Sequence, residues 1–487
     1  MTPAALTAAG VGPAGVGPAG ADPPVPRLTL TRGTWLLPGA LLGGTPGRLL
    51  RLCPAGAALL RSLLAGEARG PAAAALAQRL CAAGLASPRW PDGTLLPRAT
   101  VVVPVRDRTA ALARCLAALG PGVDVVVVDD GSRDPAAVRR VATAADARLL
   151  RRDSPGGPAV ARTDALAVVD APVVAFLDSD TVPPAGWPGP LLRHLADPAV
   201  VAVAPRVLPA TAGGGVLARL LAARSPLDLG PRAGIVAPLS PLPFVPSAAL
   251  VVRRDALGTG FDARLRHGED VDLVWRLVAD GGGVRYDPAS AVLHDEPTTW
   301  SAALGRRHRY GTSAAPLHRR HPGLLAPVVL ARMPAVAAAL LLAGRPTLAA
   351  AATGAVTGRL AGLLRAGGLP LPSAVAVTAP LAAQAVVSTL LGLGRAEATL
   401  LPALPAVLLL AGRRRAAGRA AALATAPALL AWLSQRPGVD PLRWTLACAV
   451  DDAAYGTGVW RSCLRERTLG PVLPSWGRAP HRGRLAR

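Results

Sequence analysis

The sequence contains no lysine, although it is strongly basic. All 53 of its Lys+Arg residues are arginine, set against 30 acidic residues, which gives a formal net charge of +23. A chain without lysine cannot form the Schiff base of a pyridoxal-phosphate enzyme, nor supply the lysine of a GxxxxGK[ST] phosphate loop. Asparagine is also absent, and isoleucine occurs once, at Ile235. Such a bias indicates genome composition, so we attribute part of the positive charge to it.

Aromatic residues and paired cysteines are scarce as well. Aromatic side chains make up 3% of the 487 residues, too few for the stacking platforms of single-stranded nucleic acid, and we expect no nucleic-acid partner. The five cysteines are scattered and include no CxxC pair. This pattern indicates reduced thiols in a cytosolic chain rather than disulfides or a zinc site. The remaining charge therefore points to anionic substrates or an anionic membrane surface.

The N-terminal part divides into a tract and a small module. Hydrophobic residues make up 51% of the chain, which excludes a wholly disordered protein, and the length allows two or three domains. Residues 1–26 form a Gly/Pro/Ala tract that lacks the pattern of a secretory signal, and we expect it to be disordered. Residues 27–97 combine short strands with two helical stretches. We predict a winged-helix-like module that binds nucleic acid or peptide, or only docks against the rest of the chain.

Residues 98–322 show a different pattern, in which apolar β-branched runs alternate with alanine-rich helical stretches. Strands that are apolar along their whole length are buried on both faces, which predicts an α/β fold with a parallel sheet and helical crossovers. The clearest strand candidates are residues 99–105, 123–129, 173–178 and 200–204. Ligands of such sheets bind at the carboxyl ends of the strands, so the polar residues there are the candidate site.

Carboxylates follow two of these strands. Asp129 and Asp130 end the second run, where they can accept hydrogen bonds from a base or from ribose hydroxyls. Asp178 and Asp180 follow the third run, and an Asp-x-Asp pair at this place can hold one Mg²⁺ or Mn²⁺ that keeps positions open for diphosphate oxygens. One such pair alone is weak, but acids at successive strand ends in order predict a nucleotide site.

Three further groups have both a functional and a structural interpretation. Glu269 and Asp270 stand at a helix start, where a carboxylate can take a proton from a hydroxyl or merely form an acidic first turn. His294 follows a short strand and is either a metal ligand or a structural histidine. The basic cluster around Arg306 and Arg309 could neutralise a leaving diphosphate or face a membrane surface.

The region 323–476 is apolar. Residues 366–394 carry no charge over 29 positions, which is long enough to cross a bilayer core of about 30 Å. This length favours a membrane-associated helical region with one to a few spans, and the alternative is a soluble Ala/Leu-rich bundle. Arginines between the apolar stretches would contact phosphates of inner-leaflet lipids. Residues 477–487 form a basic, polar tail.

Taken in order, these motifs resemble the inverting family 2 glycosyltransferases of GT-A fold. The resemblance covers residues 98–311 and includes Pro104-Val105, Asp129-Asp130-Gly131-Ser132, Gly156-Gly157, Asp178-Ser179-Asp180 and Gly268-Glu269-Asp270. Two positions depart from the family pattern. Arg106-Asp107 stands where Tyr-Asn is usual, and Tyr310 stands where a tryptophan usually follows the Arg-x-x-Arg pair.

The resemblance implies a nucleotide-sugar donor, a divalent metal and a role for each matched residue. Asp270 would be the catalytic base, with Glu269 and Asp272 next in line. Asp178 and Asp180 would hold the metal and diphosphate. Independently of the resemblance, we count His294 as a further candidate metal ligand. The implied donor-binding residues are Pro104, Val105, Asp129, Asp130, Arg162, Asp178, Arg306 and Arg309.

A narrower resemblance is to the mycofactocin-system glycosyltransferases of actinobacteria. It includes the segment from Leu41 to Pro46, the Leu-Arg-Leu of residues 50–52 and the Arg-Tyr-Gly that begins at Arg309. It implies transfer of glucose from UDP-glucose, in β linkage, onto premycofactocin, at the cell membrane with the catalytic domain facing the cytoplasm. Two alternatives stay open: a membrane polysaccharide or glycolipid synthase of the same fold, and a non-catalytic scaffold that binds a peptide.

Overall fold

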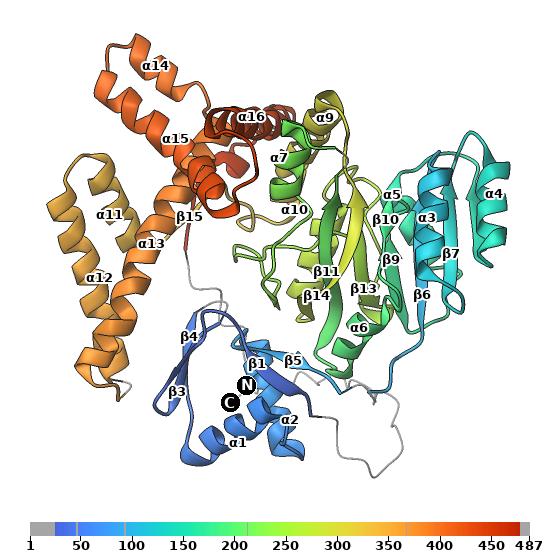
Figure 1. The fold of residues 1–487 in the computed structure, drawn as a ribbon, viewed down its shortest axis with the longest axis horizontal. Coiled ribbons are helices and arrows are strands. Elements are labelled where there is room, and N and C mark those ends of the chain that lie inside the picture. The colour runs from blue at the N-terminus through green and yellow to red at the C-terminus, as the bar shows by residue number, and fades with distance from the viewer. Residues whose placement is uncertain (1–24, 45–46, 92–93, 212, 367, 478–487) are drawn as a thin grey trace, which may run out of the picture.

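The computed structural model describes residues 25–44, 47–91, 94–211, 213–366 and 368–477. The predicted disordered tract and the basic tail lie almost wholly outside these residues. The described chain has an N-terminal unit of short strands and two helices, a central sheet covered by helices, and a group of C-terminal helices (Figure 1).

The N-terminal unit contains two small antiparallel sheets beside a helix pair. One sheet pairs β1 with β5, and the other has the order β2-β3-β4. Pro38 and Gly39 form the turn between β2 and β3, where proline is tolerated because it need not donate to the ladder. The elements are β1 (Arg27–Leu30), β2 (Trp35–Leu37), β3 (Ala40–Gly43), β4 (Arg48–Arg51), α1 (Pro54–Ala65), α2 (Pro71–Ala82) and β5 (Ala86–Arg89). The winged-helix assignment of this unit stays a prediction.

The central sheet has nine strands within the described residues, in the order β10-β14-β11-β13-β9-β6-β7-β8, with β12 paired to β14. Its strands are β6 (Ala99–Val105), β7 (Asp124–Asp130), β8 (Arg148–Arg152), β9 (Val173–Leu177), β10 (Thr181–Val182), β11 (Val200–Ala210), β12 (Gly234–Ile235), β13 (Ala249–Arg253) and β14 (Gly283–Asp295). The predicted α/β class is confirmed, and the strand candidates of the sequence lie in β6, β7, β9 and β11.

The sheet is mixed, so the prediction of a parallel sheet was wrong in part. Strands β6, β7, β8 and β9 run parallel, but β13 lies antiparallel between β9 and β11. An apolar strand buried on both faces can run in either direction, because its direction depends on where the connection returns and not on its side chains. The sequence also gave no signal for β8, whose Arg148–Arg152 segment is mostly arginine.

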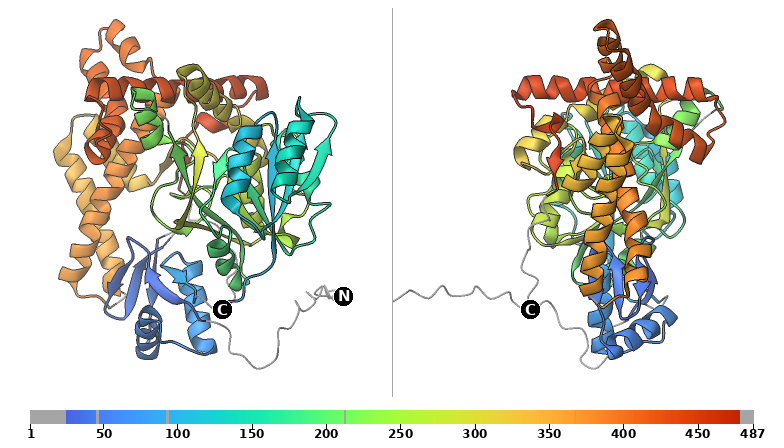
Figure 2. Two further views of the ribbon diagram at one scale, coloured as in Figure 1. Left: turned by 45° about the vertical axis from the view of Figure 1, so that its right-hand side comes forward. Right: turned by 90° about the vertical axis from the view of Figure 1, so that its left-hand side faces the viewer.

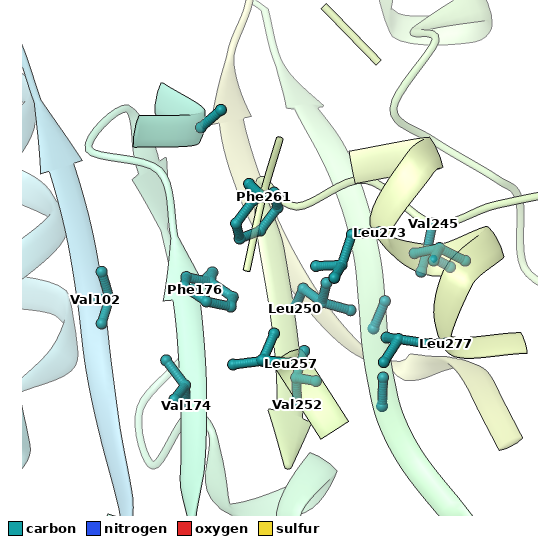
Figure 3. Packing of buried hydrophobic residues seen from close by; sticks show 14 of the residues in the cluster. Val102, Val174, Phe176, Val245, Leu250, Val252, Leu257, Phe261, Leu273 and Leu277 are labelled. Atoms are coloured by element: carbon teal, nitrogen blue, oxygen red, sulfur yellow. The ribbon is translucent and has the colours of Figure 1, made fainter. Parts of the chain in front are cut away.

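Helices cover both faces of the sheet and create two apolar cores. On one face Phe176 packs edge-on against Phe261, with ring centroids 5.0 Å apart, next to Leu273 of α8 (Figure 3). On the other face Leu112 of α3 and Trp187 are fully buried. The helices are α3 (Thr109–Leu119), α4 (Pro135–Ala144), α5 (Pro158–Ala165), α6 (Gly189–Leu192), η1 (Arg193–Ala196), α7 (Val216–Arg224), η2 (Asp255–Leu257), α8 (Glu269–Ala279), α9 (Trp300–Gly311) and α10 (Ala314–Arg320).

The C-terminal part is helical. Its elements are β15 (Val329–Leu330), α11 (Arg332–Leu342), α12 (Pro346–Ala366), α13 (Leu371–Leu400), α14 (Leu404–Leu410), α15 (Arg414–Gln435), α16 (Pro441–Glu466), η3 (Gly470–Val472) and β16 (Ser475–Trp476). Within the described residues, α12, α13 and α15 are long and apolar enough to cross a membrane, by length and composition alone. Helix α16 lies against α9 of the central part, as the views in Figure 2 show.

Candidate active site

A cavity of about 970 Å³ opens at the carboxyl ends of the parallel strands. The start of α8 lines the cavity, together with residues 324–329 and Tyr455 of α16. Most residues predicted from the sequence line this cavity, namely Pro104, Val105, Asp130, Arg162, Asp178, Asp180, Glu269, Asp270 and His294. The sheet therefore brings together side chains from positions 104 to 294.

The two carboxylates that end β7 have different surroundings. Asp129 is fully buried and does not line the cavity; it accepts hydrogen bonds from the Ser132 amide at 2.9 Å and from Arg151 at 2.5 Å. Asp130 lines the cavity and accepts the amides of Gly156 and Gly157, each at 2.7 Å. Asp129 thus stabilises the turn after the strand, while Asp130 holds the loop before α5 at the edge of the cavity.

Asp178, Asp180 and His294 form a cluster that could hold a metal ion. One ligand atom from each lies within 4.8 Å of the others. The two carboxylates follow β9 directly, and His294 reaches them because β14 pairs with the short strand β10 that starts at Thr181. His294 Nε2 lies 3.5 Å from Asp180 Oδ1. Two carboxylates and an imidazole fit a divalent cation such as Mn²⁺.

Arg162 connects this cluster to the start of α8. Its guanidinium donates to Asp178 Oδ1 at 2.6 Å and to Glu269 Oε1 at 3.2 Å, and lies 5.3 Å from the centroid of the Phe261 ring. Its side chain is 3% exposed. Burial by itself lowers the pKa of Arg162, but the charges of Asp178 and Glu269 outweigh burial and raise it, so the guanidinium stays protonated.

The start of α8 depends on a glycine. Gly268 has a φ of +82°, and a Cβ atom there would lie 2.9 Å from Leu317 Cδ1 and 3.0 Å from Ser313 Cβ. Glycine thus permits both the left-handed backbone and the close packing of α10. The N-cap residue, Gly268, has no side chain to cap the helix, and Asp270 in the first turn accepts the backbone amide of Val271.

The two acids of α8 differ in their partners. Glu269 is buried and paired with Arg162. Asp270 lines the cavity and accepts hydrogen bonds from the backbone amides of Ser247, at 3.3 Å, and of its own neighbour Val271. Burial raises the pKa of both carboxyl groups, and the charge of Asp270 raises that of Glu269 further. A carboxylate with a raised pKa that faces a cavity can act as a general base.

On α9 the cavity is lined by residues other than the predicted arginines. Arg306 pairs with Glu296, and Arg309 is exposed; neither lines the cavity. Arg307 and Tyr310 do line it. Arg307 lies 2.9 Å from Asp451 of α16 and 5.3 Å from the centroid of the Tyr455 ring. The spacing of three residues from Arg307 to Tyr310, which share one helical face, is the signal that could have identified them.

Another arginine at the cavity, Arg108, was absent from the predicted site. It follows β6 and pairs with Asp180. Like the acids of the site, Arg108 comes shortly after the end of a strand, and this position could have identified it as a candidate site residue.

Comparison with known proteins gives consistent results along the chain. Residues 100–261 match the family described as Glycosyl transferase family 2. The chain is 38% identical over 455 residues to the "Pre-mycofactocin glycosyltransferase" of two Mycobacterium tuberculosis strains, CDC 1551 / Oshkosh and ATCC 25618 / H37Rv. This similarity covers 89% of the chain and 94% of each relative.

More distant similarities cover smaller parts or have lower identity. The "Succinoglycan biosynthesis protein ExoU" of Rhizobium meliloti strain 1021 is 31% identical over 206 residues, covering 37% of the chain and 57% of the relative. The mannosyltransferase PcManGT of Pyrobaculum calidifontis, solved with GDP-Man and Mn²⁺, has a TM-score of 0.41 at 18% identity, with 77% and 89% covered. GalNAc-T7, solved with UDP, GalNAc and Mn²⁺, has a TM-score of 0.35 at 14% identity, with 46% and 48% covered.

Proposed function

Since the chain belongs to the pre-mycofactocin glycosyltransferases of glycosyl transferase family 2, we propose that it transfers glucose from UDP-glucose in β linkage onto premycofactocin. That the chain is a glycosyltransferase follows from its family, whereas its donor, its acceptor and the stereochemistry of transfer are proposals. One observation most strongly supports the proposed transfer reaction. Asp270 lines the same cavity as the cluster of Asp178, Asp180 and His294, so the proposed base and the proposed diphosphate site share one cavity.

The donor would lie along the carboxyl ends of β6, β7 and β9. Pro104, Val105 and Asp130 line the part of the cavity next to these strands and are the proposed contacts of the nucleotide. Asp178, Asp180 and His294 would hold a divalent cation, which supplies positive charge to the donor diphosphate. Arg162 orients Asp178 through its 2.6 Å hydrogen bond.

The proposed reaction is one in-line displacement. Asp270 takes the proton of the acceptor hydroxyl while that oxygen bonds to the anomeric carbon, and the bond from this carbon to the diphosphate breaks. UDP leaves with the electron pair. A single displacement inverts the anomeric centre, so an α-linked donor gives a β-linked product. Glu269, paired with Arg162, would position that arginine rather than accept the proton.

The wall beyond Asp270 supports an acceptor that is less polar than a sugar chain. Trp275, Phe244, Leu317 and the segment from Leu324 to Val329 line it. Such an apolar surface favours the body of a small cofactor over that of a growing polysaccharide, because moving apolar groups out of water lowers the free energy.

We also propose that the catalytic part faces the cytoplasm at the cell membrane. All five cysteines are free, as expected of a reducing compartment, and three apolar helices support attachment to a membrane.

A transfer assay on detergent-solubilised protein tests the function. It uses Mn²⁺ or Mg²⁺, a panel of UDP- and GDP-sugars, and either premycofactocin or a lipid phosphate as acceptor, with products analysed by mass spectrometry. We expect stepwise additions of hexose to premycofactocin from UDP-glucose. Transfer to the lipid alone would contradict the proposal that premycofactocin is the acceptor, and would support a membrane glycolipid synthase instead.

The metal site gives a prediction about ion preference. We expect Mn²⁺ to support UDP binding better than Mg²⁺, because imidazole is a poor ligand for the hard Mg²⁺ ion. His294→Ala should weaken Mn²⁺-dependent binding roughly 10–100-fold and reduce the difference between the ions. Isothermal titration of UDP in each metal checks this. The matched control is His308→Ala on α9, outside the cavity wall. Unchanged Mn²⁺ dependence would exclude His294 as a ligand.

The raised pKa of Asp270 predicts how the rate depends on pH. A base must be deprotonated, and burial raises the pKa of this carboxyl above its ordinary value of 3.8. The acidic limb of the kcat/KM profile should therefore fall at a higher pH than that of a solvent-exposed aspartate. An acidic limb within the range of an ordinary carboxyl group would contradict the assignment of Asp270 as the base.

A further inference from the structure

The helices α12 and α13 satisfy the length rule for membrane spans, yet both ends of this hairpin are held by parts of the same chain. They run side by side beside the central part, from the level of α16 to the N-terminal unit (Figures 1 and 2). At 1.5 Å per residue, the 30-residue helix α13 is about 45 Å long. What lies at each end decides whether it can cross a bilayer.

The tip of the hairpin, where α12 ends and α13 begins, packs on the N-terminal unit. Buried residues of the tip, among them Leu364 and Leu369, form one apolar cluster with Leu37, Leu42 and Leu49 of the sheet β2-β3-β4. The N-terminal unit in turn contacts the central part, because Gln78 of α2 donates to Asp197 at 3.3 Å. A small cavity of about 40 Å³ is lined by residues of both.

The base of the hairpin, at the end of α13, packs on α16. Trp460 donates to the Leu400 carbonyl at 2.9 Å, and Gly456 lies directly against Thr399. Helix α16 is joined to the central part by ion pairs of Asp451 and Asp452 with Arg307 and Arg224. The base therefore lies on the same side of any membrane as the catalytic cavity.

These contacts close a ring through the N-terminal unit, the hairpin, α16 and the central sheet. The chain from Arg89 of β5 to Ala99 of β6 reaches at most about 36 Å, whereas a bilayer with its headgroups is about 40–45 Å thick. The N-terminal unit cannot lie across a membrane from the catalytic part. Since it holds the tip, α12 and α13 do not cross the bilayer in this fold.

We propose that the C-terminal helices instead lie on one leaflet of an anionic bilayer, as a monotopic attachment surface, with all parts of the chain that the structure describes on one side. The surface consists of the outward faces of α11 and α12 and the hairpin of α14 with α15. Its exposed apolar side chains include Leu348, Leu363, Val407, Leu409 and Leu410, the last 89% exposed, and no residue of α14 is buried. The inference does not depend on the donor or the acceptor.

Charge is the argument for acidic lipid rather than a second copy of the chain. Between positions 323 and 439 the only carboxylate is Glu397, which is buried. The same segment has ten arginines: Arg332, Arg345, Arg359, Arg365, Arg395, Arg413, Arg414, Arg415, Arg419 and Arg436. Arg413, Arg414 and Arg415 follow the apolar helix α14 and are exposed. Two copies of such a surface would repel each other, whereas acidic headgroups neutralise it.

Vesicle flotation tests the lipid. The full chain should float with vesicles of phosphatidylcholine mixed with phosphatidylglycerol, and less with phosphatidylcholine alone. Arg413→Gln, Arg414→Gln and Arg415→Gln together should weaken binding to the mixed vesicles roughly 100-fold. The matched control changes Arg133, Arg139 and Arg140 to Gln, which removes the same charge around α4, at the opposite end of the molecule in Figure 1, and should leave flotation unchanged. Equal loss in both triple variants, or self-association without flotation, would overturn the proposal.

Site-directed labelling tests the topology. Cys53 is exposed and the other four cysteines are buried, so Cys53→Ser gives a background of low reactivity. Leu371→Cys reports on the tip of the hairpin and Leu401→Cys on its base, and both side chains are exposed. In sealed vesicles with the cytoplasmic face outward, an impermeant maleimide should label both positions and Cys53 of the unsubstituted chain. Labelling of tip and base from opposite faces would establish a span and overturn the proposal.

Discussion

Asp270→Asn is expected to lower the rate of sugar transfer by roughly 10²–10⁴-fold, the usual contribution of a general base. The amide keeps the size of the side chain but cannot take the acceptor proton. The donor-binding residues lie elsewhere in the cavity, on β6, β7 and the turn after β9, so UDP affinity should change little. Initial rates with premycofactocin, together with titration of UDP, separate the two quantities.

A matched control and a second variant make this prediction specific. Asp280→Asn makes the same chemical change at the exposed C-terminal end of α8 and should keep full activity. Glu269→Gln should be impaired less in rate than Asp270→Asn, because Glu269 is paired with Arg162. If Asp270→Asn kept its transfer rate and Glu269→Gln lost it, the base would be Glu269. The non-catalytic interpretation, in contrast, predicts that neither substitution changes the function of the chain.

Arg162→Met is expected to cost about 3–5 kcal/mol of unfolding free energy, because it leaves Asp178 and Glu269 facing each other without their shared cation. Methionine keeps most of the side-chain length, so the lost stability reflects the removed positive charge more than a change in side-chain volume. UDP binding should weaken as well, since Asp178 loses the hydrogen bond that orients it. Denaturant unfolding measures the change in unfolding free energy. The unfolding of the N-terminal and C-terminal parts should be followed separately.

The control for Arg162 is an arginine whose ion pair is exposed. Arg264 pairs with Asp262 at 2.9 Å, but its side chain is 83% exposed, so water screens the pair and Arg264→Met should change the stability little. Adding Glu269→Gln to Arg162→Met should restore part of the lost stability, because one of the two unpaired carboxylates is removed. A loss for Arg162→Met no larger than that for Arg264→Met would show that the buried network does not stabilise the fold.

The central strands and the acids at their ends were predictable because both depend on local sequence. A run such as Val125–Val128 has no polar side chain to expose, so it forms a strand buried on both faces wherever it pairs. A carboxylate that follows such a run either faces the cavity at the end of the strand or is paired, as Asp129 is with Arg151, since the buried interior excludes unpaired charge. These two facts explain why Asp130, Asp178 and Asp180, which the sequence predicted as site residues, line the cavity.

What the sequence by itself determined is thus the positions of β6, β7, β9 and β11, the acids at the strand ends and the apolar character of the C-terminal helices. Tertiary structure alone decided three other matters. It set β13 antiparallel, because the path of a connection is not encoded in a strand's own side chains. It brought His294 to Asp180 and Glu269 to Arg162, contacts over 100 residues apart in the chain. It also placed both ends of α13 on one side, which length and hydropathy cannot reveal because they describe a helix without its neighbours.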